Sequence, residues 1–440
     1  MFDSIKASDP DIYNLILAEQ ERQRHGMELI ASENYQSAAV LEAQSSVFAN
    51  KYSEGTPGRR YYGGQENTDQ IEQLAIDRAK SLFHSDHANV QPLSWAAANI
   101  CAYNAMMNPG DTIMGMDLSH GGHLTHGNPM TLSSKIYNFV TYKTSLIDGS
   151  IDYDALAATA KEVRPTVLLA GFSAYPRELD YAKFAQIAKD IGAYAYADMA
   201  HISGFIAAGL LKNPLDYGFH AMMTTTHKSL RGPRGAMILS KGIVSNPLKA
   251  PERTMENLPT LIDRSVFPGV QWGPHMQTIA AIAIALKEAG SETFRDYARQ
   301  SLLNAKAMAD EFLNLWYTLV TGGTDNHMIV LDFSNRLPVK GGLGGLLDGL
   351  DGTKAEKALD HIGISTSKST IPDDPNPPFR PSGLRIGTPA MTTRWVKEAD
   401  MRQIVQLMHE AFAHASDLDY LAGLQHRVME MSMKFPVPSL

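Results

Sequence analysis

Apolar and polar residues alternate in regular blocks along most of this chain of 440 residues. From about residue 70, short apolar runs typical of buried strands are separated by longer stretches with the 3.6-residue period of amphipathic helices. This order predicts an α/β fold with a largely parallel sheet and helices on both of its faces. We expect strands around 89–90 and at 112–116, 136–142, 167–171, 194–197, 221–226 and 235–239, with helices at 69–83 and 96–107.

The pattern is different before and after this block. Ser8-Asp9-Pro10 and Gly26 predict the start and end of an N-terminal amphipathic helix, because they supply a cap, a first-turn proline and a closing glycine. Residues 30–68 are rich in Gly, Asn, Tyr and Ser, so we expect an irregular segment. The glycines of 339–345 predict a loop that lacks the Lys-Ser/Thr of a nucleotide-binding motif.

Long helices become dominant after about residue 277. We expect them at 277–289, 292–315 and 396–415, around a few strands such as 328–333. The chain therefore divides into an N-terminal helix and arm (1–55), a large α/β domain (56–277) and a smaller C-terminal α/β domain (278–440).

Composition excludes several classes of function. The net charge of −8 and the pI of about 6.0 give no basic surface for nucleic acid or an acidic membrane. Cys101 is the only cysteine, so no disulfide forms within the chain and a reducing cytoplasm is expected. The first residues lack a signal-peptide pattern, and the apolar run 279–286 is too short to span a bilayer.

Two residues at strand ends predict the chemistry. Lys228 follows an apolar strand and precedes a loop held by Gly232 and Gly235. Most such lysines are solvated, but one packed into a site loses its proton and can form a Schiff base with an aldehyde cofactor. Asp198 closes another apolar strand, where open α/β sheets bind ligands. Because a carboxylate beside the ring nitrogen makes pyridoxal phosphate an electron sink, we expect Asp198 and Lys228 to hold that cofactor.

Five further motifs follow one another along the chain. They are Leu29-Ile-Ala-Ser-Glu-Asn34, Asn50-Lys-Tyr-Ser-Glu-Gly55, Arg60-Tyr-Tyr-Gly-Gly64, Asp117-Leu-Ser-His-Gly-Gly-His-Leu-Thr-His-Gly127 and Ser382-Gly-Leu-Arg-Ile-Gly-Thr-Pro-Ala390. With the Thr-Thr-Thr-His prefix of Lys228, they resemble the serine hydroxymethyltransferase family, in the family's order and almost end to end.

This resemblance implies the fold type I architecture of pyridoxal-phosphate enzymes, with a mostly parallel sheet sandwiched by helices in the large domain. It also implies a homodimer, or a dimer of dimers, whose active sites are shared between subunits. The implied reaction moves the hydroxymethyl carbon of serine to tetrahydrofolate, giving glycine and 5,10-methylenetetrahydrofolate. Pyridoxal 5'-phosphate, as a Schiff base on Lys228, is the implied cofactor, and tetrahydrofolate the co-substrate.

Chemical reasoning and the resemblance together assign the site residues. Arg385, between two apolar residues, suits the planar clamp that a substrate carboxylate needs, and Glu54 is the acid/base candidate for the β-hydroxyl. The resemblance implies catalytic roles for Lys228, Asp198, His123, Glu54, Thr226 and His227; substrate binding by Ser32, Tyr52, Tyr62, Arg385 and His201; cofactor binding by Ser94, Trp95, Ala96, His123, Ser173, Asp198, His201, Lys228 and Gly269; and folate contacts from Tyr61, Leu118, Gly122, Leu124 and Phe379.

The chain departs from the family's motifs at five positions. Trp95 and Ala96 stand where the phosphate-binding motif has Gly and Ser or Ala, and Trp272 replaces the first glycine of Gln-Gly-Gly-Pro. Glycine often allows close approach of the backbone, so either the indoles point away from the cofactor or its site is reshaped. The hydroxyl missing at Ala96 is worth ~1 kcal/mol. Ser369 replaces a pterin-binding asparagine, and Thr56 a common tyrosine.

These departures leave alternatives open. The nearest is an α-methylserine aldolase or hydroxymethyltransferase of the same family, with or without folate. An aminotransferase on the same fold and a non-catalytic RNA-binding regulator fit the motifs and the acidic charge less well. His120, His123 and His126 offer zinc ligands in principle, but no cysteine or acidic ligand pattern accompanies them, and we expect no metal.

Overall fold

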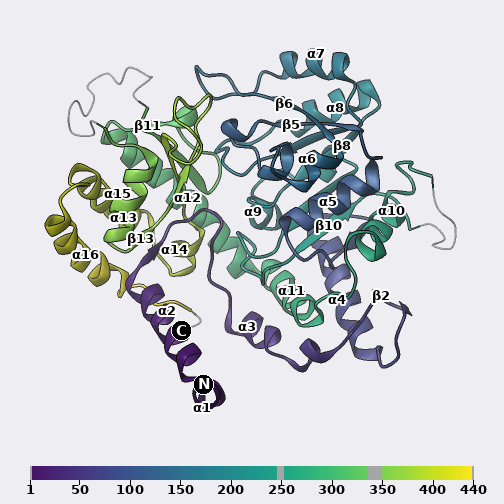
Figure 1. The fold of residues 1–440 in the computed structure, drawn as a ribbon, viewed down its shortest axis with the longest axis horizontal. Helices are drawn as coiled ribbons and strands as arrows, with labels where there is room; N and C mark the ends of the chain where they lie inside the picture. The colour runs from purple at the N-terminus through teal and green to yellow at the C-terminus, as the bar shows by residue number, and fades with distance from the viewer. Residues whose placement is uncertain (1, 245–251, 335–348, 439–440) are drawn as a thin grey trace.

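A seven-stranded sheet lies at the centre of the larger of two lobes (Figure 1). The computed structural model of the chain describes residues 2–244, 252–334 and 349–438. The predicted glycine loop at 339–345 lies outside these residues.

The sheet has the order β4-β10-β9-β8-β7-β5-β6. Neighbours from β9 through β6 are parallel, and β10 is antiparallel to both β9 and β4. The prediction of a largely parallel sheet is therefore confirmed. The strands are β4 (His87–Asn89), β5 (Thr112–Met116), β6 (Asn138–Tyr142), β7 (Val167–Gly171), β8 (Tyr194–Asp198), β9 (Ala221–Thr225) and β10 (Ala236–Ser240).

Both faces of this sheet are buried, each in its own apolar cluster. On β7, Leu168 and Ala170 enter one cluster while Val167 and Leu169 enter the other. This alternation explains why the strand reads as a continuous apolar run in the sequence. The covering helices are α4 (Glu66–Phe83), α5 (Trp95–Met106), α6 (Leu132–Ile136), α7 (Tyr153–Val163), α8 (Tyr181–Ile191), α9 (Ser203–Ala207), α10 (Leu258–Arg264) and α11 (Met276–Ala289).

The smaller lobe contains an antiparallel sheet of order β11-β12-β15-β14. Its strands are β11 (Thr318–Leu319), β12 (Met328–Asp332), β14 (Ser367–Ser369) and β15 (Gly383–Gly387). The accompanying helices are α12 (Glu292–Asn314), α13 (Gly352–His361), α14 (Pro389–Thr393), α15 (Glu398–Ala413) and α16 (Leu418–Ser432).

The N-terminal segment joins this smaller lobe. α2 (Pro10–His25) follows α1 (Asp3–Ser8), is capped by Asp9 and ends at Gly26, as predicted. β1 (Met27–Glu28) then pairs with β13 (Ile364–Ser365). The buried clusters also show that α11 and the first turns of α12 pack into the large lobe's core. The domain limits at 55 and 277 stay a prediction.

Two local predictions are wrong. Residues 30–68 are not wholly irregular: they include α3 (Ala38–Gln44) and the hairpin of β2 (Gly55–Thr56) and β3 (Arg59–Arg60). Ile136 ends α6 instead of opening β6, because a single apolar residue fits either element. Among the described helices, none is both long and apolar enough to cross a membrane.

Candidate active site

The carboxyl ends of three neighbouring strands bring the central residues together. β7 ends two residues before Ser173, β8 ends with Asp198, and β9 ends with Thr225, three residues before Lys228. Because these strands are parallel, their ends open at one edge of the sheet. A Cβ at Gly171 would lie 2.6 Å from the Cβ of Asp198, so the glycine lets β7 pass close to this carboxylate.

Asp198 is a fully buried carboxylate with three N–H donors on one oxygen. Its Oδ2 accepts hydrogen bonds from Trp95 Nε1 (2.6 Å), Asn99 Nδ2 (2.8 Å) and His126 Nε2 (2.9 Å). Burial alone would raise the pKa of Asp198, but the hydrogen bond and charge of His126 outweigh it and bring this pKa to about 2. The group is therefore ionised at neutral pH.

Asn99 and His126 were missed as partners of Asp198. Asn99 lies four residues after Trp95 on α5, which places both side chains on one helix face. That spacing could have indicated Asn99. His126 carries no such signal, because the loop around it approaches β8 only in the folded chain.

The Trp95 indole lies inside this site. It stacks on the His123 imidazole, with 3.6 Å between ring centroids and 11° between planes. The Lys228 Nζ lies 3.8 Å from the indole centroid, and the indole N–H bonds to Asp198. His201 packs edge-on at 5.5 Å. A stacked histidine, a carboxylate at the ring nitrogen and an adjacent lysine are the contacts expected for the cofactor's pyridine ring, so this indole does not point away.

The residues around the indole fit pyridoxal phosphate, and the indole itself does not. Asp198 is ionised for a pyridinium, and the buried Nε2 of His201 has no hydrogen-bond partner among the described residues. Such an orphaned ring nitrogen suits a ligand's polar group. The pyridine ring and the Trp95 indole nevertheless require the same volume, so the cofactor does not fit while the indole is there.

Lys228 is buried with its amine on the hydroxyl of Thr225, at 2.9 Å. Burial lowers its pKa to about 7, against the attraction of Asp198. The uncharged amine, the form that attacks an aldehyde, is therefore available near neutral pH. Thr225, which sequence reasoning did not single out, is this hydrogen-bond partner. Thr226 points to the opposite side, as successive strand side chains do, and its Oγ1 donates to the Pro233 carbonyl at 2.6 Å. The catalytic role of Thr226 stays a prediction.

Arg385 reaches the site from β15 of the smaller lobe. Its Nη1 donates to the carbonyl and the hydroxyl of Ser173, at 2.7 and 3.1 Å, and its Nε to Ser367 Oγ at 3.3 Å. Burial lowers the pKa of this guanidinium to about 10, so it keeps its charge at neutral pH. A cation held across the two lobes, near the buried amine of Lys228, is suited to bind a substrate carboxylate.

Histidines line the same region as neutral groups. Burial lowers the pKa of His123 and of His227 to about 3, and that of His201 well below its usual value. His201 stacks on His327, 5.6 Å between centroids, and His327 Nε2 lies 3.1 Å from the Ala31 carbonyl. Sequence reasoning missed His327, which directly precedes β12 without any motif.

An arm from the N-terminal region carries Glu54 and three tyrosines. Glu54 is buried, whereas Tyr52, Tyr61 and Tyr62 are 59%, 70% and 52% exposed. Tyr52 and Tyr62 contact each other edge to face, and Tyr61 contacts Phe267. Exposed aromatic clusters of this kind are typical of surfaces that bind a ligand, a membrane or another protein.

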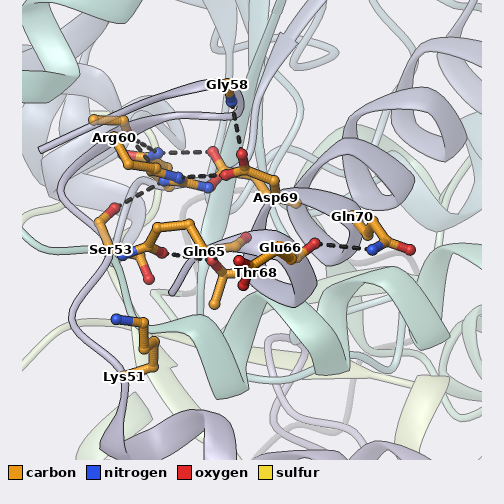
Figure 2. A network of polar contacts seen from close by, with 12 residues as sticks. Lys51, Ser53, Gly58, Arg60, Gln65, Glu66, Thr68, Asp69 and Gln70 are labelled. Atoms are coloured by element: carbon orange, nitrogen blue, oxygen red, sulfur yellow. Dashed lines mark hydrogen bonds and ion pairs between the residues drawn. The ribbon is translucent and has the colours of Figure 1, made fainter. Parts of the chain in front are cut away.

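A buried arginine anchors this arm to α4 (Figure 2). Arg60 forms ion pairs with Asp69 (2.8 Å) and Glu72 (2.6 Å), and its Nη1 donates to the Ser53 and Gly55 carbonyls. Glu72 in turn accepts from Gln91, just before the predicted phosphate-binding turn. This network positions the backbone on both sides of Glu54.

The remaining predicted residues lie at the surface or in the backbone of loops. Ser94 caps α5 by accepting from the Ala97 N–H, and a Cβ at Gly122 would lie 2.1 Å from the Met116 carbonyl oxygen. Their binding roles stay predictions. Ala96, Gly269, Leu124 and Phe379 are exposed, and Ser32 and Leu118 are half-buried.

The three histidines at 120, 123 and 126 do not all lie together in the folded chain. His120 faces Thr144 and Asp373, whereas His123, His126 and Asp198 bring possible ligand atoms within 4.8 Å of one another. The interpretation that no acidic ligand accompanies these histidines is therefore wrong, because tertiary structure supplies Asp198. Its Oδ2 is engaged by three N–H groups there.

The sequence also matches a known protein family. A family model described as serine hydroxymethyltransferase matches residues 5–408, well over half of the chain. The matched range includes every predicted site residue, the large lobe and the smaller lobe as far as the middle of α15.

Proposed function

The chain belongs to the serine hydroxymethyltransferase family, whose members are pyridoxal-phosphate-dependent transferases, and from this premise we propose that it transfers the hydroxymethyl group of serine to tetrahydrofolate. The products are glycine and 5,10-methylenetetrahydrofolate. The observation that carries the proposal is one aromatic-ring site enclosed by Lys228, Asp198 and stacked His123.

Each residue around that site has its own proposed role in the reaction. Arg385 binds the amino acid's carboxylate, because it keeps its charge and sits beside Ser173. Lys228 supplies an uncharged amine near neutral pH. Glu54 accepts and returns the β-hydroxyl proton. The neutral histidines exclude water without adding positive charge.

Catalysis requires that the ring site be free of the Trp95 indole. Pyridoxal phosphate supplies an electron sink that no side chain provides. While the Trp95 indole donates to Asp198 Oδ2 at 2.6 Å, the cofactor ring has no place to bind. The proposed reaction therefore belongs to a form of the protein in which position 95 leaves the ring site open.

The exposed arm supports a homodimer. Tyr52, Tyr61 and Tyr62 stand at the surface beside the segment around Phe267, so a second copy would bury them and complete the site. We place the protein in the cytoplasm, because its one cysteine, Cys101, is buried and free.

The test compares the chain with a Trp95→Gly variant, both incubated with pyridoxal phosphate. Each receives serine or α-methylserine, with and without tetrahydrofolate, and amino acid products and formaldehyde are measured. We expect the variant to form glycine fastest from serine with folate, and Lys228→Met in the same background to form none. Faster, folate-independent formaldehyde release from α-methylserine would instead establish the α-methylserine aldolase and reject our proposal.

A further inference from the structure

All four tryptophans of this chain stand where glycine is expected. They are Trp95, Trp272, Trp316 and Trp395. Three different observations apply: the ring site at position 95, the left-handed helix ends at positions 316 and 395, and the predicted glycine motif at position 272. The agreement between these observations carries the inference.

Position 95 lacks room for a side chain if the cofactor is to bind. The Trp95 indole lies between His123 and Lys228 and uses the Asp198 carboxylate. The stacked imidazole, the amine and the carboxylate around it suit a ring that is not part of the chain. A glycine at 95 removes the indole and leaves those contacts intact.

Trp316 closes α12 in a backbone conformation that favours glycine. Its φ is +65°. The Trp316 N–H donates to the Leu313 carbonyl (3.0 Å) and the Tyr317 N–H to the Phe312 carbonyl (2.9 Å). This pair of hydrogen bonds defines the Schellman motif, whose left-handed residue is usually glycine.

Trp395 closes α14 in the same way. Its φ is +63°. The Trp395 N–H donates to the Thr392 carbonyl (2.9 Å), and the Val396 N–H to the Met391 carbonyl (3.2 Å). A left-handed conformation costs a residue with a Cβ about 1 kcal/mol. Both indoles are more than half exposed, so packing does not offset this cost.

Other helices of the chain show which residue this motif takes. α8 and α9 end with the same two hydrogen bonds, and their left-handed residues are Gly192 (φ +73°) and Gly209 (φ +67°). Non-glycine residues are also tolerated after helices, as His84 and Arg164 show. A single tryptophan at the left-handed position after a helix would therefore not be evidence for glycine.

Trp272 stands in the motif that resembles Gln-Gly-Gly-Pro, at its first glycine. Its indole is 60% exposed and touches Phe267 edge-on. This ring lies on the surface that the proposed dimer buries, where Gly269, predicted to bind the cofactor, is also found. A bulky side chain there conflicts with close approach of a second backbone.

We infer that positions 95, 272, 316 and 395 carry glycine in the protein that its cell makes. Glycine accounts for 34 of 440 residues, so independent placement would not put all four tryptophans on glycine positions. One cause explains all four. The codon UGA ends translation in the standard genetic code, is read as tryptophan in some other codes and as glycine in still others.

The direct test reads the gene and the protein from the natural host. We expect one codon, UGA, at all four positions, and glycine in the four peptides by tandem mass spectrometry. Tryptophan in any of these peptides would overturn the inference for that position, and tryptophan in all four would overturn it entirely. Peptide masses do not depend on activity, so this result is separate from the fate of the proposed reaction.

A second test uses variants of the recombinant chain. Trp316→Gly and Trp395→Gly should each raise the melting temperature, whereas Trp316→Ala and Trp395→Ala should not, because alanine keeps the Cβ. Equal melting temperatures for glycine and alanine would contradict the backbone argument.

The ring site is tested by cofactor binding alone. Trp95→Gly should give the visible absorbance of lysine-bound pyridoxal phosphate at concentrations where the tryptophan chain gives none. Trp95→Phe is the matched control, because a phenyl ring still fills the site. If the tryptophan chain binds the cofactor as tightly as Trp95→Gly, the indole does not block the site and the inference for this position fails.

Discussion

Exchange of Lys228 for methionine should stabilise the cofactor-free chain, and more so at low pH. Methionine fills a similar volume without a charge. Burial lowers the pKa of Lys228 from 10.5 to about 7, so the unfolded chain binds more protons between these pH values and stability rises with pH across that window. Below about pH 7 the penalty is fully present, and above about pH 10.5 it is gone.

The magnitude follows from these two pKa values. Each pH unit between them corresponds to about 1.4 kcal/mol, so the buried amine costs about 5 kcal/mol near pH 6 and about 2 kcal/mol near pH 9. The gain in unfolding free energy for Lys228→Met should therefore fall by about 2 to 3 kcal/mol between these pH values. The hydrogen bond from this amine to Thr225 is not added separately, because its dependence on the charge of the amine is already part of the folded-state pKa.

Urea unfolding of both proteins, followed by circular dichroism from pH 6 to pH 9, measures this difference. Lys189→Met is the matched control: this lysine is exposed on α8, and its exchange should shift stability equally at every pH. Parallel stability curves for the chain and Lys228→Met would refute the reasoning, since they would mean that the amine keeps its ordinary pKa.

Three further predictions concern other residues. Arg60→Met should lower the unfolding free energy by about 3 kcal/mol in urea titrations, because it leaves two carboxylates without their buried partner. Arg59→Met, at an exposed position, should change the unfolding free energy little. Equal effects of the two exchanges would contradict the role of burial. In the Trp95→Gly background, Arg385→Lys should lower kcat/KM for serine roughly 30-fold, because it loses a charged hydrogen bond worth about 2 kcal/mol. An unchanged KM for serine would show that Arg385 does not bind the substrate carboxylate. Gly122→Ala should lower the melting temperature, because its Cβ would lie 2.1 Å from a carbonyl oxygen, whereas Gly63→Ala, with open space around it, should not.

Several elements could be predicted because their signals are local. β5 and β7 match the predicted bounds, since both are short apolar runs between polar boundaries. Residues 30–68 show the limit of such signals. Their α3 helix is stabilised by packing against α11, far away in the sequence, and a composition rich in Gly and Asn does not reveal that contact.

In the candidate site, too, some features could be predicted from the sequence and others could not. The sequence by itself determined that Asp198 and Lys228 lie at strand ends, because strand order in a parallel sheet puts those ends at one edge. Only the tertiary structure decided that Thr225 contacts the amine instead of Thr226, that His126 reaches the carboxylate, and that the Trp95 indole enters the ring site. Motif and periodicity specify where a residue stands along the chain, whereas the direction and neighbours of a side chain depend on packing between segments distant in sequence.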